Sequence, residues 1–330
     1  EFTRTLIPDS KEALDEIKNL LGNLESLLQG IYLINELSPK TVDKLLAYGE
    51  ILSSSIIARA MYAQGLDAVR KDSRDLITTN DKHTKAGVNY KVTNSQVEYY
   101  FTKAKQKITV LPGFIASTAQ GETTTLGRGG SDFTAAIVAA ALDVDQVEIY
   151  TDVSGMYTAN PKMVKQAKPI DSISYHEAME LSHFGAKVLY PPTIVPVMSK
   201  NIPIRIKNTL QPEDPGTLIH NQEGLSDNPI KGLSNINNVA LLTLEGGGMV
   251  GIPGISKRLF ETLSNQGINI ILITQASSEH SICLGVMEED AGKAKNAIDE
   301  EFEYEISLNK IDTLTIEIGL SIIALVGDQM

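Results

Sequence analysis

The sequence predicts an α/β protein in two parts: a larger domain built on a mainly parallel sheet, then a smaller α+β module. Up to about residue 220, short apolar runs that suit strands alternate with longer stretches of helical periodicity. After a polar linker at residues 220–229, the order of elements changes to strand, helix, strand, strand, helix. Three features therefore predict the fold class: the alternation of strands and helices, the polar linker, and the different order of elements after the linker.

The first helices follow from hydrophobic periodicity and from capping signals. They are expected at residues 10–30 and 39–62, with Ser10 and Ser38 as their caps. Proline follows the second cap directly, at the first helical position, where its fixed φ angle suits a helix. We expect this second helix to pause at residues 48–53, where a tyrosine, a glycine and a glutamate interrupt the apolar pattern.

The rest of the first part alternates between strands and helices. Residues 70–94 are polar and irregular, which predicts a long surface segment near a substrate opening. Strands are expected at residues 65–69, 108–112, 147–150 and 202–206, a hairpin at residues 119–125, and helices at residues 95–107, 133–142, 174–189 and after Pro191. This order predicts βα units and hence a largely parallel sheet.

The second part reads as most of a ferredoxin-like module. Strands are expected at residues 239–244, 268–274 and 280–287, and helices at residues 255–266 and 291–302. The pattern of residues 239–246 recurs 81 positions later at residues 320–327, with the alternation and the final glycine kept. We therefore expect the chain to end inside the first strand of a second, similar module.

Composition limits the possible partners and compartments. Of 330 residues, 42% are hydrophobic, which is ample for packed cores and argues against disorder. The formal net charge of −12 argues against nucleic-acid binding, which depends mostly on phosphate neutralisation. A single cysteine, Cys283, excludes an internal disulfide and suits a reducing compartment.

No apolar run approaches the roughly 20 residues that span a bilayer, and no signal peptide is recognisable, so we expect a cytoplasmic protein without a membrane partner. The chain begins at Glu1 without an initiator methionine and stops at Met330 inside a predicted strand. We therefore expect further sequence beyond both ends.

The most informative stretch is a glycine-rich loop at residues 127–132 (GRGGSD), called the glycine loop below. Its three glycines let the backbone approach a ligand closely, and Ser131 or Asp132 could cap the apolar helix that follows. The first N–H groups of such a helix form a site for an anion. Because the helix is apolar on all sides, we expect it to be buried. The alternative is a tight turn with a surface ion pair between Arg128 and Asp132.

A second glycine run, at residues 246–251 (GGGMVG), matches the dinucleotide-binding pattern G-x-G-x-x-G. The next strand, however, ends in Thr274 and Gln275 without the acidic residue that would hold a ribose, and its continuation suggests a hairpin. A flexible turn at an effector site, or ordinary turn chemistry, is favoured instead. The chain contains no P-loop and no protein-kinase catalytic loop. Its five histidines are scattered, and no metal site is predicted.

The remaining polar residues of the first part suit phosphoryl transfer, in which catalysis consists mainly of positioning and charge stabilisation. They are Arg128 and Asp132 in the glycine loop, Thr151 and Asp152 at a strand end, Tyr157 and Lys162 in the next loop, and Lys187 in a helix. Glu50 lies between apolar stretches. From the residues alone it is favoured as a solvated helix residue, with a buried acceptor for a ligand cation as the alternative.

Four runs resemble the aspartate kinase family. They are YGE at residues 48–50, LGRGGSD at residues 126–132, YTDVSG at residues 150–155 and FGAKVLYP at residues 184–191. Their order and spacing agree with that family over roughly residues 10–330. Two later runs, KGLSN at residues 231–235 and ITQASSE at residues 273–279, resemble regulatory ACT domains. The chain is most similar to the kinase half of bifunctional aspartokinase–homoserine dehydrogenases.

This resemblance implies an amino-acid-kinase fold, a three-layer αβα sandwich, at residues 1–222. It implies a first ACT domain at residues 229–310 and the start of a second at residues 311–330. The family's N-terminal strand, with its Lys-Phe-Gly-Gly-Thr-Ser motif, has no counterpart in these residues. The implied reaction is MgATP-dependent phosphorylation of the β-carboxylate of L-aspartate. The alternative is a catalytically impaired fragment that binds a regulatory amino acid.

The resemblance also assigns roles to residues. Arg128 would bind the substrate α-carboxylate, Glu50 and Asp132 would hold its ammonium group, and Phe114 would line the pocket. The nucleotide and its phosphates would be held by Thr151, Asp152, Tyr157, Lys162 and Lys187. The residues implied to act in catalysis are Arg128, Asp132 and Lys187. For Glu50, this role replaces the solvated position favoured above.

In the regulatory part, the resemblance implies an effector site at Met249, Ile255, Gln275 and Ser277, with threonine or lysine as the effector. The alternative for Gln275 is that it merely ends a strand. Pairing of ACT domains would make the protein a homodimer or a higher homo-oligomer. One departure concerns the nucleotide site: the family's Asp-Pro-Arg is Asn160-Pro161-Lys162 here, and lysine keeps the charge but loses the planar fork.

Overall fold

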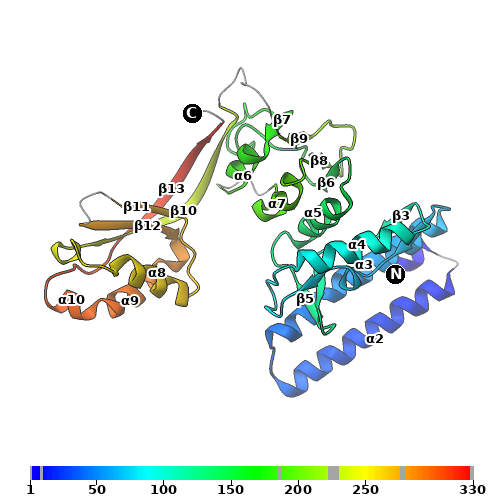
Figure 1. The fold of residues 1–330 in the computed structure, drawn as a ribbon, viewed down its shortest axis with the longest axis horizontal. Helices are drawn as coiled ribbons and strands as arrows, with labels where there is room; N and C mark the ends of the chain where they lie inside the picture. Colours follow the sequence, from blue (N-terminus) through cyan, green and yellow to red (C-terminus); the bar gives the residue numbers. More distant parts are fainter. Residues whose placement is uncertain (1, 8–9, 184–187, 222–229, 276–279, 328–330) are drawn as a thin grey trace. The chain divides into compact units, whose positions relative to one another are not determined.

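The computed structural model describes residues 2–7, 10–183, 188–221, 230–275 and 280–327 (Figure 1). The chain divides into two compact units, Glu1–Gly232 with Gly327–Met330, and Leu233–Val326. Each unit has its own hydrophobic core. The two parts predicted from the sequence therefore correspond to two packed units, which are described separately below.

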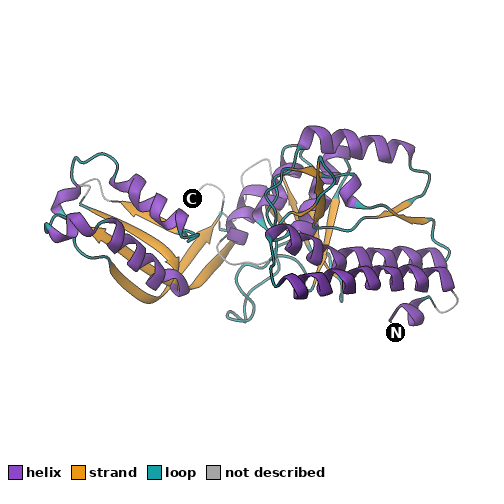
Figure 2. Ribbon diagram, turned by 90° about the horizontal axis from the view of Figure 1, so that it is seen from below, coloured by secondary structure: helices purple, strands orange, loops and turns teal. Residues whose placement is uncertain are grey.

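The first unit begins with α1 (Phe2–Leu6) and two long helices that pack together, α2 (Lys11–Ile34) and α3 (Pro39–Ala63) (Figure 2). Both predicted caps are confirmed: Ser10 Oγ accepts from Ala13 N at 3.1 Å, and Ser38 Oγ accepts from Thr41 N at 3.2 Å. The predicted pause at residues 48–53 is wrong. Helix α3 runs through it because Ala47 and Ile51 continue a buried face on both sides of Gly49.

The sheets of the first unit are mainly parallel, as predicted. Strand β1 (Ala68–Arg70) pairs in parallel with β3 (Ile108–Val110), and β2 (Thr78–Thr79) pairs in parallel with β4 (Ile115–Thr118). A four-stranded sheet has the order β6-β8-β9-β7, formed by Val147–Thr151, Ile204–Asn208, Thr217–His220 and Ser172–Ser174. Antiparallel pairing occurs between β8 and β9 and between β4 and β5 (Thr123–Thr125), which form the predicted hairpin.

Helices cover these sheets. Helix α3 packs on β1, β3 and β5, whereas α5 (Gly130–Leu142) contacts β6, and α6 (Tyr175–His183) contacts β7 and β9. Helix α4 (Tyr90–Lys103) packs against α5, and η2 (Pro191–Thr193) leads into the short α7 (Ile194–Met198). The core beneath α4 and α5 contains Leu76, Ile77, Val97, Ala116, Leu126 and Ile137.

The segment at residues 70–94 is more ordered than its composition suggested. It contains η1 (Ser73–Asp75), strand β2 and the first turns of α4, which starts at Tyr90, whereas the predicted helix began at residue 95. Asn89 caps α4 by accepting from Val92 N at 3.3 Å. Thr78 and Thr79 of β2 are buried and pair with β4, so tertiary pairing rather than local apolarity forms this strand.

The second unit has the predicted ferredoxin-like order. It consists of β10 (Gly232–Glu245), η3 (Gly247–Met249), α8 (Ile255–Asn265), β11 (Leu272–Gln275), β12 (Ser281–Met287), η4 (Glu288–Asp290), α9 (Ala291–Glu301), α10 (Glu303–Ser307) and β13 (Thr315–Val326). The sheet order is β11-β12-β10-β13, and α8 and α9 cover one face of it (Figures 1 and 2). Residues such as Leu242 and Leu284 pair directly across β10 and β12 and are buried under these helices.

Strand β13 includes the repeated pattern at residues 320–326. We expected it to begin a second module, but here it lies beside β10 and completes the sheet of the first. A strand with alternating apolar positions can complete an existing sheet as readily as it can start a new one. The second compact unit accordingly continues past residue 311 to Val326.

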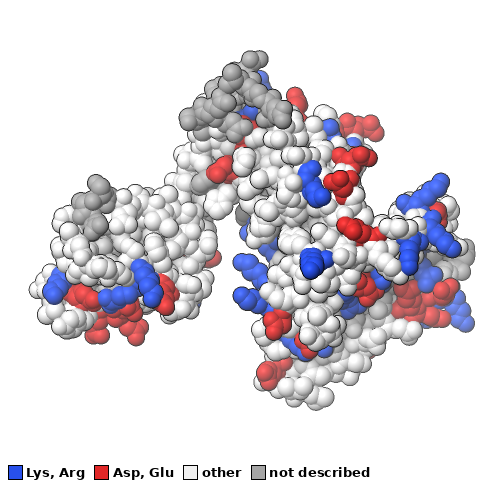
Figure 3. Space-filling model, in the orientation of Figure 1, with Lys and Arg blue, Asp and Glu red and all other residues white. Residues whose placement is uncertain are grey.

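Charged side chains of both signs occur on the surface of the described residues (Figure 3). Basic and acidic side chains are interspersed on the face drawn in Figure 3. Among the described residues, no helix is both long and apolar enough to cross a membrane.

Candidate active site

The glycine loop connects β5 to α5, and its backbone conformation requires glycine. Gly127 and Gly129 have φ angles of 76° and 69°, in the left-handed region that other residues avoid. A Cβ atom at Gly129 would lie 2.6 Å from Tyr190 Cβ, and one at Gly130 would lie 2.7 Å from Phe114 Cδ2. The loop is therefore packed tightly against neighbouring segments of the same unit.

The start of α5 differs from the prediction. The N-cap is Gly129, and no side chain accepts a hydrogen bond there, so neither Ser131 nor Asp132 caps the helix. Both residues lie inside the first helical turn, too far along to act as caps. The N-terminus of α5 thus has no side-chain acceptor of its own, which keeps it suitable for an anion.

Helix α5 is also only partly buried. Thr134, Ala136 and Ile137 are buried, whereas Ala135 is exposed. The predicted burial therefore holds for part of the helix, because Ala135 and Val138 line a cavity beside it.

This cavity has a volume of about 510 Å³ and is lined by residues from four elements and their loops. They include Glu50 from α3, Thr109 from β3, Gly113 and Ser131 near the glycine loop, Val138 from α5 and Val147 from β6. Among the described residues, β3 pairs only with β1 and β6 only with β8, so the cavity lies between two open strand edges. Glu50 and the first turn of α5 therefore face one shared space.

Two carboxyl groups at this site are half-buried without ionic partners in the described part of the chain. Burial raises the pKa of the Glu50 carboxyl, and burial likewise raises the pKa of the Asp132 carboxyl. Arg128 is exposed, and the ion pairs of the described residues do not include it. The alternative of a turn with an Arg128–Asp132 ion pair is therefore not what the structure contains.

Phe114 links the glycine loop to α3. Its N–H donates to Thr134 Oγ1 at 3.0 Å, and its carbonyl accepts from Leu126 N at 2.9 Å. Its φ angle of 69° is unusual for an aromatic residue and costs on the order of 1–3 kcal/mol. Its side chain packs on the α3 face that contains Ala47 and Ile51, so this strained residue fixes the loop relative to the helix that carries Glu50.

The residues predicted to hold a nucleotide follow β6. Thr151 ends this strand, and its hydroxyl donates to Asp152 Oδ1 at 3.2 Å. Tyr157 is half-buried and forms an isolated bridge with Pro169. Because β6 and β8 are parallel, Thr151 and Asp152 lie at the carboxyl end of a parallel pair, where α/β sheets bind ligands.

Lys162 and Lys187 are less well connected to that site. Lys162 is exposed in the predicted turn, where its N–H donates to Asn160 Oδ1 at 3.0 Å. No contact of its side chain with Thr151 or Asp152 occurs in the described structure. Lys187 lies outside the described residues.

In the second unit, two of the predicted effector residues belong to the core. Met249 and Ile255 are only 4% and 6% exposed and pack under the sheet, so their side chains do not form a surface site. The turn before α8 brings both against the sheet, which their apolar character favours. Gln275 is exposed at the end of β11, and Ser277 lies outside the described residues.

The second glycine run is not a dinucleotide site. Strand β10 pairs antiparallel with β12, whereas a dinucleotide fold requires parallel strands there. Cβ atoms at Gly246 and Gly248 would lie 2.4 Å and 2.8 Å from Lys310 O, so these glycines allow close approach of the chain's own backbone.

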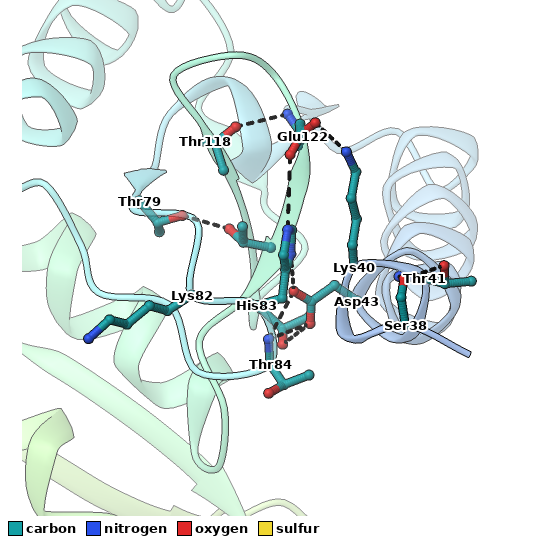
Figure 4. Close-up of polar contacts among 12 residues, drawn as sticks. Ser38, Lys40, Thr41, Asp43, Thr79, Lys82, His83, Thr84, Thr118 and Glu122 are labelled. Atoms are coloured by element: carbon teal, nitrogen blue, oxygen red, sulfur yellow. Dashed lines mark hydrogen bonds and ion pairs between the residues drawn. The ribbon is translucent and has the colours of Figure 1, made fainter. Parts of the chain in front are cut away.

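Sequence reasoning missed one polar network beside the glycine loop (Figure 4). Asp43 on α3 is completely buried and contacts His83, Thr84 and Thr125. The sequence showed His83 only as one of five scattered histidines, and nothing in it pointed to Asp43. Their only sequence signal is that Asp43 lies seven positions before Glu50, two helical turns away on the same face of α3.

Comparisons with known proteins identify the family. The amino acid kinase family matches residues 9–208, and the ACT domain matches residues 242–302. The bifunctional aspartokinase/homoserine dehydrogenase 1 of Arabidopsis thaliana is 37% identical over 323 residues, which are 96% of this chain and 36% of that protein. The chain thus spans about a third of the length of such bifunctional relatives.

Shorter relatives are covered more fully. The lysine-sensitive aspartokinase 3 of Escherichia coli is 32% identical over 319 residues, 96% of this chain and 69% of that protein. The crystal structure of E. coli aspartokinase III in complex with aspartate and ADP superposes with a TM-score of 0.79 at 31% identity, covering 97% of this chain and 70% of that one. The predicted resemblance and fold class are confirmed, and the chain belongs to the aspartokinases of the amino acid kinase family, with an ACT domain behind the kinase domain.

Proposed function

We propose that the protein is an ATP-dependent aspartate kinase. It would transfer the γ-phosphoryl group of ATP to the β-carboxylate of L-aspartate, giving 4-phospho-L-aspartate and ADP, the first step of lysine, threonine and methionine biosynthesis. One observation carries the proposal: in the described part of the chain, Arg128 and the half-buried Asp132 at the start of α5 have no ionic partner, and the half-buried, equally unpaired Glu50 lines a cavity with Ser131 of the same helix turn.

These groups complement an amino acid. An α-carboxylate would take the two parallel donors of Arg128, which is the strongest geometry for that pair. An ammonium group near Glu50 and Asp132 would favour their ionised forms and offset the effect of burial on their pKa values. Phe114 would line the same pocket, beside Gly130.

The transfer needs little covalent chemistry from the protein. A β-carboxylate oxygen attacks the γ-phosphorus, the bond from that phosphorus to the bridging oxygen breaks, and ADP leaves with the electron pair. The attacking carboxylate is already ionised at neutral pH, so no general base is required. The N-terminus of α5 would stabilise the charge on the transferred group.

Thr151, Asp152 and Tyr157 would hold the nucleotide, with Lys162 and Lys187 near its phosphates. ATP supplies the phosphoryl group, and Mg²⁺ would be bound chiefly through phosphate oxygens and water. The E. coli structure with aspartate and ADP supports this pair of ligands for a relative.

The test is an assay of the full-length protein with ATP, Mg²⁺ and one acid at a time: aspartate, glutamate or N-acetylglutamate. Hydroxylamine traps an acyl phosphate as a hydroxamate, and released ADP is measured in parallel. We expect hydroxamate and equal ADP from aspartate alone. Absence of product from aspartate, or equal product from glutamate, would contradict the proposal.

The ACT domain favours a second activity, binding of a regulatory amino acid, with threonine as the first candidate and lysine as the second. Gln275 is exposed at the end of β11, and its amide can both donate to and accept from a zwitterion. Calorimetry with threonine and lysine should show weaker binding by Gln275→Ala than by the wild type. Gln266→Ala, at the end of α8, is the control and should bind normally. Equal binding by all three would remove Gln275 from the site.

Effector binding without phosphorylation would favour the alternative of a regulatory module without kinase activity.

We also propose a homo-oligomer formed through the ACT region. Support comes from apolar side chains left exposed on the strands of the second unit, such as Ile273 at 55%, Ile318 at 63% and Ile323 at 73%. Sedimentation should give a mass of at least a dimer, whereas a monomer at all concentrations would contradict this.

A further inference from the structure

The network around Asp43 includes none of the groups that would touch substrate. It does contact Thr84, which packs on the glycine loop, and Thr125, which leads into that loop. Asp43 is 0% exposed. Its carboxylate accepts from Thr84 N with both oxygens, at 3.0 Å and 2.9 Å, and from Thr125 Oγ1 at 2.6 Å. A buried carboxylate is tolerated when its oxygens are satisfied in this way.

His83 is the imidazole that lies beside this carboxylate. Its Nδ1 lies 2.8 Å from Asp43 Oδ2, and its Nε2 lies 4.0 Å from Glu122 Oε2. Glu122 in turn pairs with Lys40 of α3 (Figure 4). The imidazole therefore lies between one buried and one partly exposed carboxylate, and the short contact with Asp43 orients its ring.

The segment that Asp43 holds is a closed loop at residues 80–87. Its ends are joined by Asn80 N donating to Gly87 O at 2.9 Å and by Gly87 N donating to Asn80 Oδ1 at 3.0 Å. Thr84, near its tip, has a φ angle of 68°, which a β-branched residue avoids. The double hydrogen bond from Thr84 N to Asp43 maintains this conformation.

The same loop rests on the glycine loop. A Cβ atom at Gly127 would lie 3.3 Å from Thr84 O and 3.5 Å from Lys85 Cγ. Ala86 N donates to Thr125 O at 2.9 Å, two residues before Gly127. Asp43 thus fixes Thr84 against the first glycine and fixes Thr125 where the chain enters the loop, three residues before Arg128.

We propose that Asp43, with His83 as its partner, is a positioning residue for substrate binding: it fixes residues 84 and 125 around Gly127 and thereby sets where Arg128 lies. Asp43 touches no substrate atom in this account. The inference rests on the proposed aspartate kinase function, because the loop it positions is the one that would bind the substrate α-carboxylate.

The main test compares Asp43→Asn with the wild type in steady-state kinetics. Asparagine keeps the shape but replaces one acceptor oxygen with an NH2 donor, so Thr84 N loses one of its two acceptors whichever way the amide is turned. We expect the KM for aspartate to rise about tenfold, with the KM for ATP changed less than about twofold. An unchanged KM for aspartate in an active protein would overturn the proposal.

Glu177→Gln is the matched control. Glu177 is also a buried carboxylate, 3% exposed, that accepts a backbone N–H, from Ser174 at 2.9 Å, but it caps α6 away from the glycine loop. Both variants should lose stability, whereas only Asp43→Asn should change the KM for aspartate. If both change it equally, the effect is general destabilisation and the proposal fails.

Milder variants keep the test decisive if Asp43→Asn does not fold. Thr125→Val removes only the hydroxyl donor and should raise the KM for aspartate by a smaller factor. His83→Gln keeps a side-chain donor toward Asp43 and should stay near the wild type, whereas His83→Ala should not. A wild-type KM in both Thr125→Val and His83→Ala would overturn the proposal.

Hydrogen exchange separates this proposal from the proposed function. If the wild type does not phosphorylate aspartate, the function fails, but the amides of residues 82–86 and 126–131 can still be compared. We expect exchange about tenfold faster in Asp43→Asn at both segments and not in Glu177→Gln. Equal exchange in Asp43→Asn and the wild type would show that Asp43 positions neither segment.

Discussion

Glu50 and Asp132 are half-buried carboxyls without a cationic partner in the described part of the chain. Such an arrangement opposes folding at neutral pH, because the charged form loses hydration without gaining a partner. It becomes favourable only when a ligand supplies the missing charge. These two residues therefore lower the stability of the unliganded protein but serve to bind a ligand, as is common at functional sites.

This predicts that Glu50→Gln and Asp132→Asn raise the melting temperature of the unliganded protein at pH 7.5. Burial raises each folded-state pKa above its unfolded value, so the folded protein holds these protons more tightly. That contribution is fully present below the ordinary carboxyl pKa and is lost as the pH rises through the raised pKa. The gain in melting temperature should therefore shrink toward pH 4.

Calorimetric melts across that pH range measure the effect, with Glu25→Gln on the exposed surface of α2 as the control. The control should melt like the wild type at both ends of the range. A lower melting temperature of both site variants at pH 7.5 would contradict this description of the site.

The glycines of the loop allow a second test at this scale. A Cβ atom at Gly130 would lie 2.7 Å from Phe114 Cδ2 and 3.1 Å from Phe114 Cα. Gly130→Ala should cost about 1–3 kcal/mol in the free energy of unfolding, since Phe114 or the loop must shift. It should also raise the KM for aspartate.

Gly49→Ala is the matched control in α3, where a Cβ atom would meet nothing within 4 Å. It should stabilise the helix by about 0.5–1 kcal/mol, because alanine restricts the unfolded chain more than glycine does. Denaturant titrations compare the two variants. Stabilisation by Gly130→Ala would mean that the loop is not packed as described.

Helices and strands differ in how far local sequence determines them. Caps at Ser10 and Ser38 and the long apolar repeats made α2 and α3 predictable. Strand β2 contains only threonine, and its burial depends on neighbours far along the chain, so no local pattern revealed it as a strand. The same limit applies to the site. The type and order of Arg128, Asp132 and Glu50 were informative, whereas the role of Asp43 depends on a loop 40 residues away.

At this scale, the cap of α3 can be tested alone. Ser38→Ala removes the acceptor for Thr41 N and should lower the free energy of unfolding by about 1 kcal/mol. Ser26→Ala, in the middle of α2 on an exposed face, should change it by less than about 0.5 kcal/mol. Equal effects of the two substitutions would show that the cap does not stabilise α3.

At the scale of the whole molecule, the chain consists of two units with separate cores. Phe302 is completely buried in the second unit, against helices α8 and α9 and the sheet. The sequence predicted this module but ended it after α9, because the last strand, β13, follows a gap and repeats the pattern of β10. Strand β13 pairs beside β10 in the sheet of this module, and the assignment of residues 311–330 to a second ACT domain stays a prediction.

Phe302→Ala should lower the stability of the second unit by about 3–5 kcal/mol. Hydrogen exchange should then become faster at buried amides of β10 and β12 while α5 in the first unit keeps its protection. Leu308→Ala, at an exposed position of the same unit, is the control and should change neither. Equal acceleration in α5 would show that the units do not have independent cores.

The central claim is that the glycine loop binds aspartate through Arg128. The measurement that tests it most directly is the kcat/KM for aspartate of Arg128→Ala and Arg128→Lys in the full-length protein. Arg128 is exposed and has no ion pair in the described structure, so both variants should fold normally. We predict a loss of about 100-fold or more for alanine and a smaller loss for lysine, which keeps the charge but not the fork, with little change in the KM for ATP. A wild-type kcat/KM for aspartate in Arg128→Ala would contradict the claim.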